Sequence, residues 1–175
     1  MSGHSKWSQI KHQKEIVDKK RGQVFSKALK AISIAARGEP NPQFNPKLRS
    51  AIQKAKDSNV PTENIEKAIK KASETSDNIE ELIMEAYGPG GTAILIEAIT
   101  DNRNRTVTEI KHLVNKNGGK WAEPGSVRWA FEKVKEKWIS KFPQKLAGGD
   151  KKQLEALIKI LVDHQDVQEI HTNAG

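Results

Sequence analysis

A chain of 175 residues, 35% of them hydrophobic, can fill the core of one ordinary domain or two small ones, which argues against extended disorder. It contains no cysteine, which excludes disulfide bonds, thiolate zinc sites and cysteine nucleophiles, and no apolar run that resembles a signal peptide or a membrane span. We therefore expect a cytoplasmic protein that does not bind membranes.

The net charge of +8 lies entirely in the first part of the chain. Residues 1–75 contain 16 basic and 7 acidic side chains, whereas residues 76–175 contain 14 basic and 15 acidic ones. A segment with one sign of charge predicts a surface that binds a polyanion, because each phosphate that a cation neutralises releases condensed counterions. The alternative is a lysine-rich helix face that only keeps the protein in solution.

Helical spacing dominates residues 1–77, where apolar side chains recur on one side of four successive segments. The first of these helices carries lysines on its other side. Local signals mark where the others end and begin: Gly38 and Pro40 after the second helix, Asn45 and Pro46 before the third, and Pro61 before the fourth. We expect one basic helical bundle, because no single helix could bury its apolar side alone.

Residues 78–175 show the spacing of strands as well as helices. The expected strands cover residues 81–87, 92–100, 126–132, 137–142 and 166–171, and the expected helices cover residues 105–117 and a segment introduced by Gly148. From Thr92 onward the order is β-α-β-β-α-β, which is ferredoxin-like. The expected fold class is α+β: an N-terminal helical bundle in residues 1–77, followed by a ferredoxin-like antiparallel sheet with two helices in residues 78–175.

The sequence contains no recognisable catalytic constellation. Its five histidines, at positions 4, 12, 112, 164 and 171, lack the spacing of metal ligands, and no serine-hydrolase or zinc-protease motif occurs. We therefore expect a protein that is not an enzyme and that uses no metal, cofactor or small-molecule substrate.

Two of the tryptophans have distinct expected environments. Trp121 lies in a glycine-rich stretch without periodic apolar partners, so an exposed position is expected. Trp129 and Phe131 alternate along an expected strand, which would place both rings on one face of the sheet, buried under the helices. Trp121 lies in the loop of residues 120–123, which we expect to help discriminate between partners, and this makes it a candidate for binding.

Two connections could meet phosphate groups. The turn of residues 88–91 could cradle a phosphate with its amides, but glycines of this kind usually serve the turn itself, and the turn is the favoured interpretation. Arg103 and Arg105 stand at an expected helix start, a geometry suited to phosphate. Asp101 or Asn102 could instead cap that helix, and both interpretations stay open.

Five stretches together resemble one known family. They are MSGHSKWSQIKHQK at residues 1–14, YGPGG at 87–91, TDNRNRT at 100–106, GGKWAEPGSVRWAF at 118–131 and DVQEIHTNA at 166–174. This series is similar to the YebC/PmpR family of probable transcriptional regulators, which includes mitochondrial translational activators of cytochrome c oxidase. Members of that family usually carry a further small α/β domain after the strand that ends near Phe131. Here the chain passes through residues 132–137 directly into the closing strand, so we expect a shortened form without that domain.

The resemblance implies a regulator of gene expression that binds nucleic acid. Some members are described as binding promoter DNA and others as working at the ribosome, on stalling sequences such as proline runs. We place DNA-binding transcription regulation first and ribosomal RNA second, and the oligomeric state stays open. The candidate binding residues are Lys6, Lys11, His12, Lys14, Lys19, Lys20, Arg21, Lys27, Lys30, Arg103, Arg105, Lys120 and Trp121.

Overall fold

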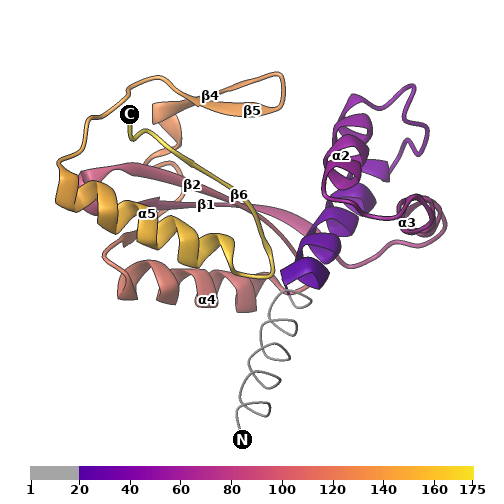
Figure 1. The fold of residues 1–175 in the computed structure, drawn as a ribbon, viewed down its shortest axis with the longest axis horizontal. Coiled ribbons are helices and arrows are strands. Elements are labelled where there is room, and N and C mark those ends of the chain that lie inside the picture. Colours follow the sequence, from indigo (N-terminus) through magenta and orange to yellow (C-terminus); the bar gives the residue numbers. More distant parts are fainter. Residues whose placement is uncertain (1–19) are drawn as a thin grey trace, which may run out of the picture. The chain divides into compact units, whose positions relative to one another are not determined.

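The computed structural model describes residues 20–175 and divides the chain into two compact units, one up to Ser76 and one from Asp77 onward (Figure 1). The expected boundary, between residues 77 and 78, lies one residue away. Five of the candidate binding residues fall outside the described part: Lys6, Lys11, His12, Lys14 and Lys19.

The described part of the first unit is helical, as expected, whereas the first of the four expected helices falls outside the described residues. Residues 20–36 form one helix, followed by α2 (Pro46–Asp57) and α3 (Thr62–Glu74). Asn45 explains where α2 begins. Its side-chain oxygen accepts a hydrogen bond from the Leu48 amide at 2.9 Å, while its amide group donates to the Ala35 carbonyl at 2.6 Å and the Glu39 carbonyl at 2.8 Å. One side chain thus caps α2 and ties it to the preceding helix. The shared core contains Ile32, Ala35, Ala36, Leu48, Ala55, Val60 and Ile65.

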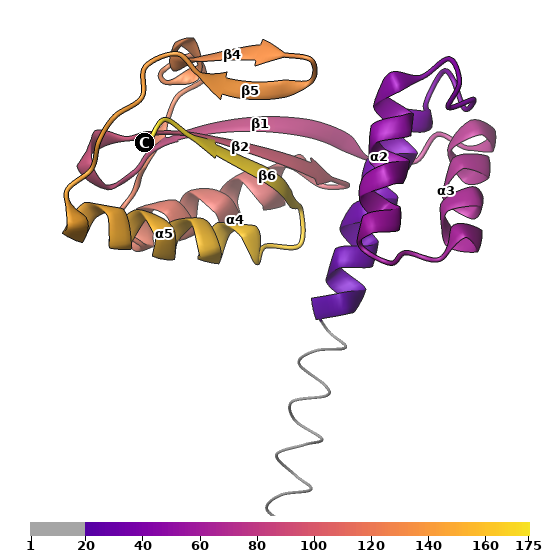
Figure 2. The same cartoon turned by 45° about the horizontal axis from the view of Figure 1, so that its top comes forward.

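The second unit contains a four-stranded antiparallel sheet in the order β3-β1-β2-β6. Its strands are β1 (Glu80–Tyr87), β2 (Ala93–Thr100), β3 (Lys120–Ala122) and β6 (Val167–Thr172). Helices α4 (Arg103–Lys116) and α5 (Gly148–Val162) cover one face, and a separate hairpin of β4 (Phe131–Val134) and β5 (Lys137–Ser140) lies on the other (Figure 2). The expected α+β class, with helices followed by an antiparallel sheet that carries two helices, is confirmed.

The two faces of the sheet have separate apolar cores. Alternate side chains of β1 and β2 point toward the helices, where Met84 and Ile96 pack with Ile110, Leu157 and their neighbours. The intervening side chains of β2, Ala93 and Leu95, face the hairpin side. Because β2 is central and covered on both faces, it reads as a nearly continuous apolar run.

The strand membership differs from the ferredoxin-like expectation. The expected strands at 126–132 and 137–142 do not join the main sheet, and the short β3 occupies the edge beside β1 instead. Residues Arg128–Ala130 form one turn of 3-10 helix rather than a strand. The reason is Glu85, whose buried carboxylate accepts hydrogen bonds from the amides of Gly125, Val127 and Arg128 at 2.6, 2.8 and 3.0 Å. These donors are therefore not available to a strand ladder.

The expected burial of Trp129 under the helices is wrong. Its side chain is 62% exposed, because the 3-10 turn rotates it away from the sheet. Phe131 is buried as expected, but it packs against Leu95 and Val127 on the face opposite the helices.

The turn at residues 88–91 has a packing role. A Cβ atom added at Gly88 would lie 2.5 Å from the Thr92 Oγ1 atom and 2.9 Å from the Ile94 Cδ1 atom, so only glycine fits there. Gly90 has a φ of 72°, a value that side chains disfavour. These features support the interpretation of this segment as a structural turn.

Candidate nucleic-acid interface

The positive charge of the first unit continues into the described residues. Residues 20–75 contain 12 basic and 5 acidic side chains, and the helix of residues 20–36 contains no acidic side chain at all. Lys20 and Arg21 are exposed on this helix, with the Arg21 guanidinium 5.3 Å from the centre of the Phe25 ring, and Lys27 and Lys30 are half-buried on it. The four candidate residues on this helix thus share one short, purely basic segment.

The two later helices of this unit differ in charge. Helix α2 carries Lys47, Arg49, Lys54 and Lys56 against a single acidic residue, Asp57. Helix α3 balances its own charges through ion pairs one turn apart, Lys67 with Glu63 at 2.7 Å and Lys70 with Glu74 at 4.0 Å. The surplus of positive charge is therefore concentrated on the helix of residues 20–36 and on α2.

The start of α4 is capped by its own sequence. The Asn102 side-chain oxygen accepts a hydrogen bond from the Arg105 amide at 3.1 Å, and the Asn102 amide donates to the Thr100 hydroxyl at 2.9 Å. Of the two interpretations of this segment, capping by Asn102 is the one that the geometry shows.

Arg105 points into the protein. Its Nη2 atom lies 2.6 Å from a carboxylate oxygen of Asp166, whose side chain is fully buried and also accepts a hydrogen bond from the Thr106 hydroxyl at 2.8 Å. The hydrogen bond that Arg105 donates to Asp166 raises the pKa of Arg105, together with the nearby charges of Asp166, Asp101 and Glu109, although burial acts in the opposite direction. Arg105 therefore ties α4 to the segment that leads into β6.

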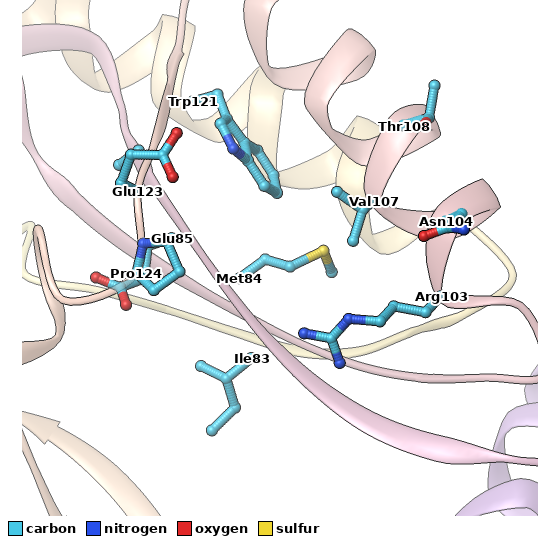
Figure 3. Close-up of a pocket in the computed structure, with 11 residues that line it drawn as sticks. Ile83, Met84, Glu85, Arg103, Asn104, Val107, Thr108, Trp121, Glu123 and Pro124 are labelled. Carbon is cyan, nitrogen blue, oxygen red and sulfur yellow. The ribbon is translucent and has the colours of Figure 1, made fainter.

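Arg103 has a different environment, on the surface at the same helix start. Its Nη1 atom lies 3.2 Å from a carboxylate oxygen of Glu80, and both side chains are largely exposed. Arg103 and Trp121 line the same hollow of about 420 Å³ (Figure 3). This hollow is bordered by β1, by the first turns of α4, and by β3 with the loop that follows it. The residues that line it are Ile83, Met84, Glu85, Arg103, Asn104, Val107, Thr108, Trp121, Ala122, Glu123 and Pro124.

The hollow exists because β3 is short. β3 pairs with β1 only along Glu85–Tyr87, so within the described chain no strand lies beside residues 80–84 on that edge. Met84, Val107 and Trp121 provide an apolar lining, Arg103 stands at one side, and Glu123 stands across from it (Figure 3). Such a site suits a planar ring on the apolar lining, with a negative group near Arg103.

The expected exposure of Trp121 is only partly realised. Trp121 belongs to β3 rather than to a loop, its amide donates to the Asn115 side chain at 2.9 Å, and its ring packs against the helix-side core. Lys120 precedes it on the strand and is exposed. Because side chains alternate along a strand, Lys120 points away from the face that Trp121 occupies. The structure thus unites Arg103 with Trp121 in one hollow and separates both from Lys120 and Arg105.

Two clusters could offer ligand atoms to a metal ion: Glu97 with Glu169 and His171, and Glu109 with His164 and Asp166. In both, existing contacts already use the side chains. Glu97 accepts hydrogen bonds from Trp138 at 3.1 Å and pairs with His171 at 3.0 Å. Burial opposes the ionisation of Glu97, but its contacts with His171 and Trp138 outweigh burial, so the pKa of Glu97 lies below its ordinary value. In the second cluster Asp166 is paired with Arg105 and His164 with Glu109. Both clusters therefore have a structural role.

Among residues 20–175, no helix has both the length and the apolar character that crossing a bilayer requires.

Comparison with known proteins gives a consistent assignment for both units. The family described as the TACO1/YebC protein N-terminal domain matches residues 5–75, and the one described as the TACO1/YebC second and third domain matches residues 79–136. Neither match extends beyond residue 136.

Relatives of this chain are named as probable transcriptional regulatory proteins. One from Dehalococcoides mccartyi is 53% identical over 135 residues, which cover 75% of this chain and 54% of the relative. One from Solibacter usitatus is also 53% identical over 135 residues, with 76% and 54% coverage. The chain thus spans about half the length of these curated relatives. Among solved structures, a conserved hypothetical protein from Aquifex aeolicus matches with a TM-score of 0.80 and 31% identity, covering 91% of this chain and 92% of the other.

Proposed function

This chain belongs to the TACO1/YebC family, and on that premise we propose that it is a non-enzymatic regulator of gene expression that binds DNA. The observation that carries the proposal is the helix of residues 20–36, which contributes four cations and no carboxylate and continues the basic segment of residues 1–19. The names of the relatives support a role in transcription. Ribosomal RNA is the alternative polyanion, and the experiments below separate the two.

We assign different tasks to the two units. Exposed lysines neutralise phosphates without reading their arrangement, so the first unit supplies affinity of low specificity. A hollow that combines the planar guanidinium of Arg103 with the ring of Trp121 can discriminate between partners by shape. Glu123 strengthens this discrimination, because its carboxylate repels a second phosphate that is wrongly placed.

We expect duplex DNA binding to weaken with salt and with loss of the basic helix. If about five cations contact phosphates, the logarithm of the binding constant should fall with the logarithm of salt with a slope of about −4 to −5. Reversing the charges of Lys20, Arg21, Lys27 and Lys30 to glutamate should lower affinity about 100-fold at physiological salt, as measured by fluorescence anisotropy.

The matched control for this variant reverses four exposed lysines of α4 and α5 to glutamate: Lys111, Lys116, Lys151 and Lys152. It changes the net charge by the same amount but leaves the basic helix intact, so it should lower the affinity for duplex DNA only slightly. Equal losses in both variants would mean that total charge, and not the basic helix, drives binding. Circular dichroism of both variants checks that the helices remain.

Sedimentation of tagged protein from lysate, with and without ribonuclease, separates DNA from ribosomal RNA as the physiological partner. For a DNA-binding regulator we expect no ribonuclease-sensitive migration with ribosomal particles, together with gel shifts of duplex DNA at physiological salt. Migration with the particles, combined with weak and sequence-independent DNA binding, would replace the DNA proposal by the ribosomal alternative.

Replacement of the two hollow-lining residues should reduce discrimination more than affinity. We expect Arg103→Gln combined with Trp121→Leu to reduce the ratio of specific to non-specific binding about tenfold, because each good directional contact contributes about 1–3 kcal/mol. The salt slope should change by at most about one, since only one cation is lost. Lys120→Gln, on the opposite side of β3, is the control. A double variant with unchanged discrimination would make the hollow a purely structural feature.

A further inference from the structure

Two large aromatic rings are exposed side by side near the β4–β5 hairpin. Trp129 is 62% exposed and Phe142 is 55% exposed, and their ring centres lie 5.6 Å apart with an interplanar angle of 51°. They come from opposite ends of the hairpin segment, Trp129 from the 3-10 turn before β4 and Phe142 from just after β5. We call this pair of rings the aromatic platform.

The Trp129 ring and the backbone that carries the Phe142 ring are held in place although both rings face solvent. The Trp129 indole N–H donates to the Ser126 carbonyl at 2.8 Å, and the amides that precede Trp129 are held by the buried Glu85 carboxylate. On the other side, the Asn173 side chain donates to the Phe142 carbonyl at 3.2 Å, and the Lys141 amide donates to the Ala130 carbonyl at 2.9 Å. Rings that are fixed before a partner arrives lose little conformational entropy on binding.

The segment that carries the platform has a charge opposite in sign to that of the rest of the second unit. Residues 128–145 contain six basic and two acidic side chains, whereas the other residues between 76 and 175 contain 8 basic and 13 acidic ones. The Lys141 ammonium lies 5.8 Å from the centre of the Phe142 ring. The basic residues of this segment are Arg128, Lys133, Lys135, Lys137, Lys141 and Lys145.

We propose that the aromatic platform binds unpaired nucleotides of a single-stranded nucleic acid. Exposed rings provide faces on which bases stack, and Lys141 together with the other cations of residues 128–145 can contact the sugar-phosphate backbone. Two other partners fit this surface less well. A second copy of the chain would bring the same positive segment against itself, and an acidic peptide would leave the ring faces without a planar partner. This proposal rests on the proposed function and deepens it by naming the form of nucleic acid that the second unit binds.

The test compares single-stranded and duplex probes on the full chain. Fluorescein-labelled oligo(dT) and oligo(U) of about 12 nucleotides, a length within the usual site sizes, are titrated beside a duplex of equal length. We expect Trp129→Ala combined with Phe142→Ala to weaken single-strand binding 10- to 100-fold and to leave duplex binding within twofold. Phe44→Ala, at a ring that is 73% exposed in the first unit, is the matched control and should change neither. A preference between oligo(dT) and oligo(U) then tells whether DNA or RNA is the strand that is bound.

Failure of the platform proposal and failure of the proposed function give different results in this test. Unchanged single-strand binding by the platform variant, with duplex binding intact, overturns the platform and leaves the proposed function standing. Single-strand binding that depends on the platform, without any duplex binding, supports the platform and overturns DNA duplex as the main partner. If sedimentation shows that the wild type self-associates, that the platform variant does not, and that single-strand affinity is the same in both, the platform is an interface between copies and the proposal is wrong.

Discussion

Replacing Arg105 by alanine is expected to destabilise the second unit by about 2–3 kcal/mol, which makes it a structural residue rather than a surface cation. The variant removes the cationic partner 2.6 Å from Asp166, whose side chain remains fully buried. A buried carboxylate without its counter-charge is costly, although Thr106 still donates one hydrogen bond at 2.8 Å. For a unit of this size the melting temperature should fall by about 10–20 °C. Tryptophan fluorescence during heating measures this change.

Two further variants test this explanation. Arg103→Ala removes an arginine from the same turn, but its ion pair with Glu80 is exposed, so the melting temperature should hardly change. In an Asp166→Asn background, Arg105→Ala should lower the free energy of unfolding by clearly less than it does in the wild type, because no buried charge is left behind. If Arg105→Ala lowered the free energy of unfolding equally with and without the Asp166 charge, the arginine would stabilise the protein by other contacts. Any loss of nucleic-acid binding by Arg105→Ala must therefore be compared with its stability.

Replacing Glu85 by alanine is expected to lower the free energy of unfolding by about 3–5 kcal/mol, at least as much as Arg105→Ala. The reason is that three backbone donors lose the acceptor that they share. The amides of Gly125, Val127 and Arg128 all point at this carboxylate beneath the sheet. Each buried donor left without a partner costs about 1–3 kcal/mol, less where water can enter. Thermal unfolding followed by near-ultraviolet circular dichroism reports both the stability and the packing of Trp129.

The isosteric variant Glu85→Gln separates charge and hydrogen bonding from volume. Its amide group cannot accept, so at least one of the three donors loses its acceptor and an intermediate loss is expected. Glu132→Gln, at an exposed position on β4, is the control and should change stability little. If Glu85→Gln melted like the wild type, the carboxylate would not hold the turn. In that case the orientation of the aromatic platform would need another explanation.

Local signals in the sequence predicted the elements whose ends are determined by neighbouring residues. The start of α2 was predictable from Asn45 and Pro46, since a cap and its helix lie within one turn of each other. β1, β2 and α4 were likewise found within a few residues of their bounds, because alternation and helical periodicity reflect burial along one element. The concentration of positive charge before residue 76 was also visible without any structure.

Only the tertiary structure decided which side chains meet across long stretches of chain. Arg105 and Asp166 are 61 residues apart, and although Asp101 and Glu109 stand four residues on either side of Arg105, nothing local shows that its guanidinium reaches a buried carboxylate. The same holds for Glu85, which turns an alternating segment around Trp129 from a strand into a 3-10 turn by binding amides about 40 residues away. Periodicity records which residues of one element are buried, but it carries no information about which distant acceptor satisfies a given donor. That information decided that Trp129 lies on the surface, whereas the short pairing of β3 with β1 decided that Arg103 shares a hollow with Trp121.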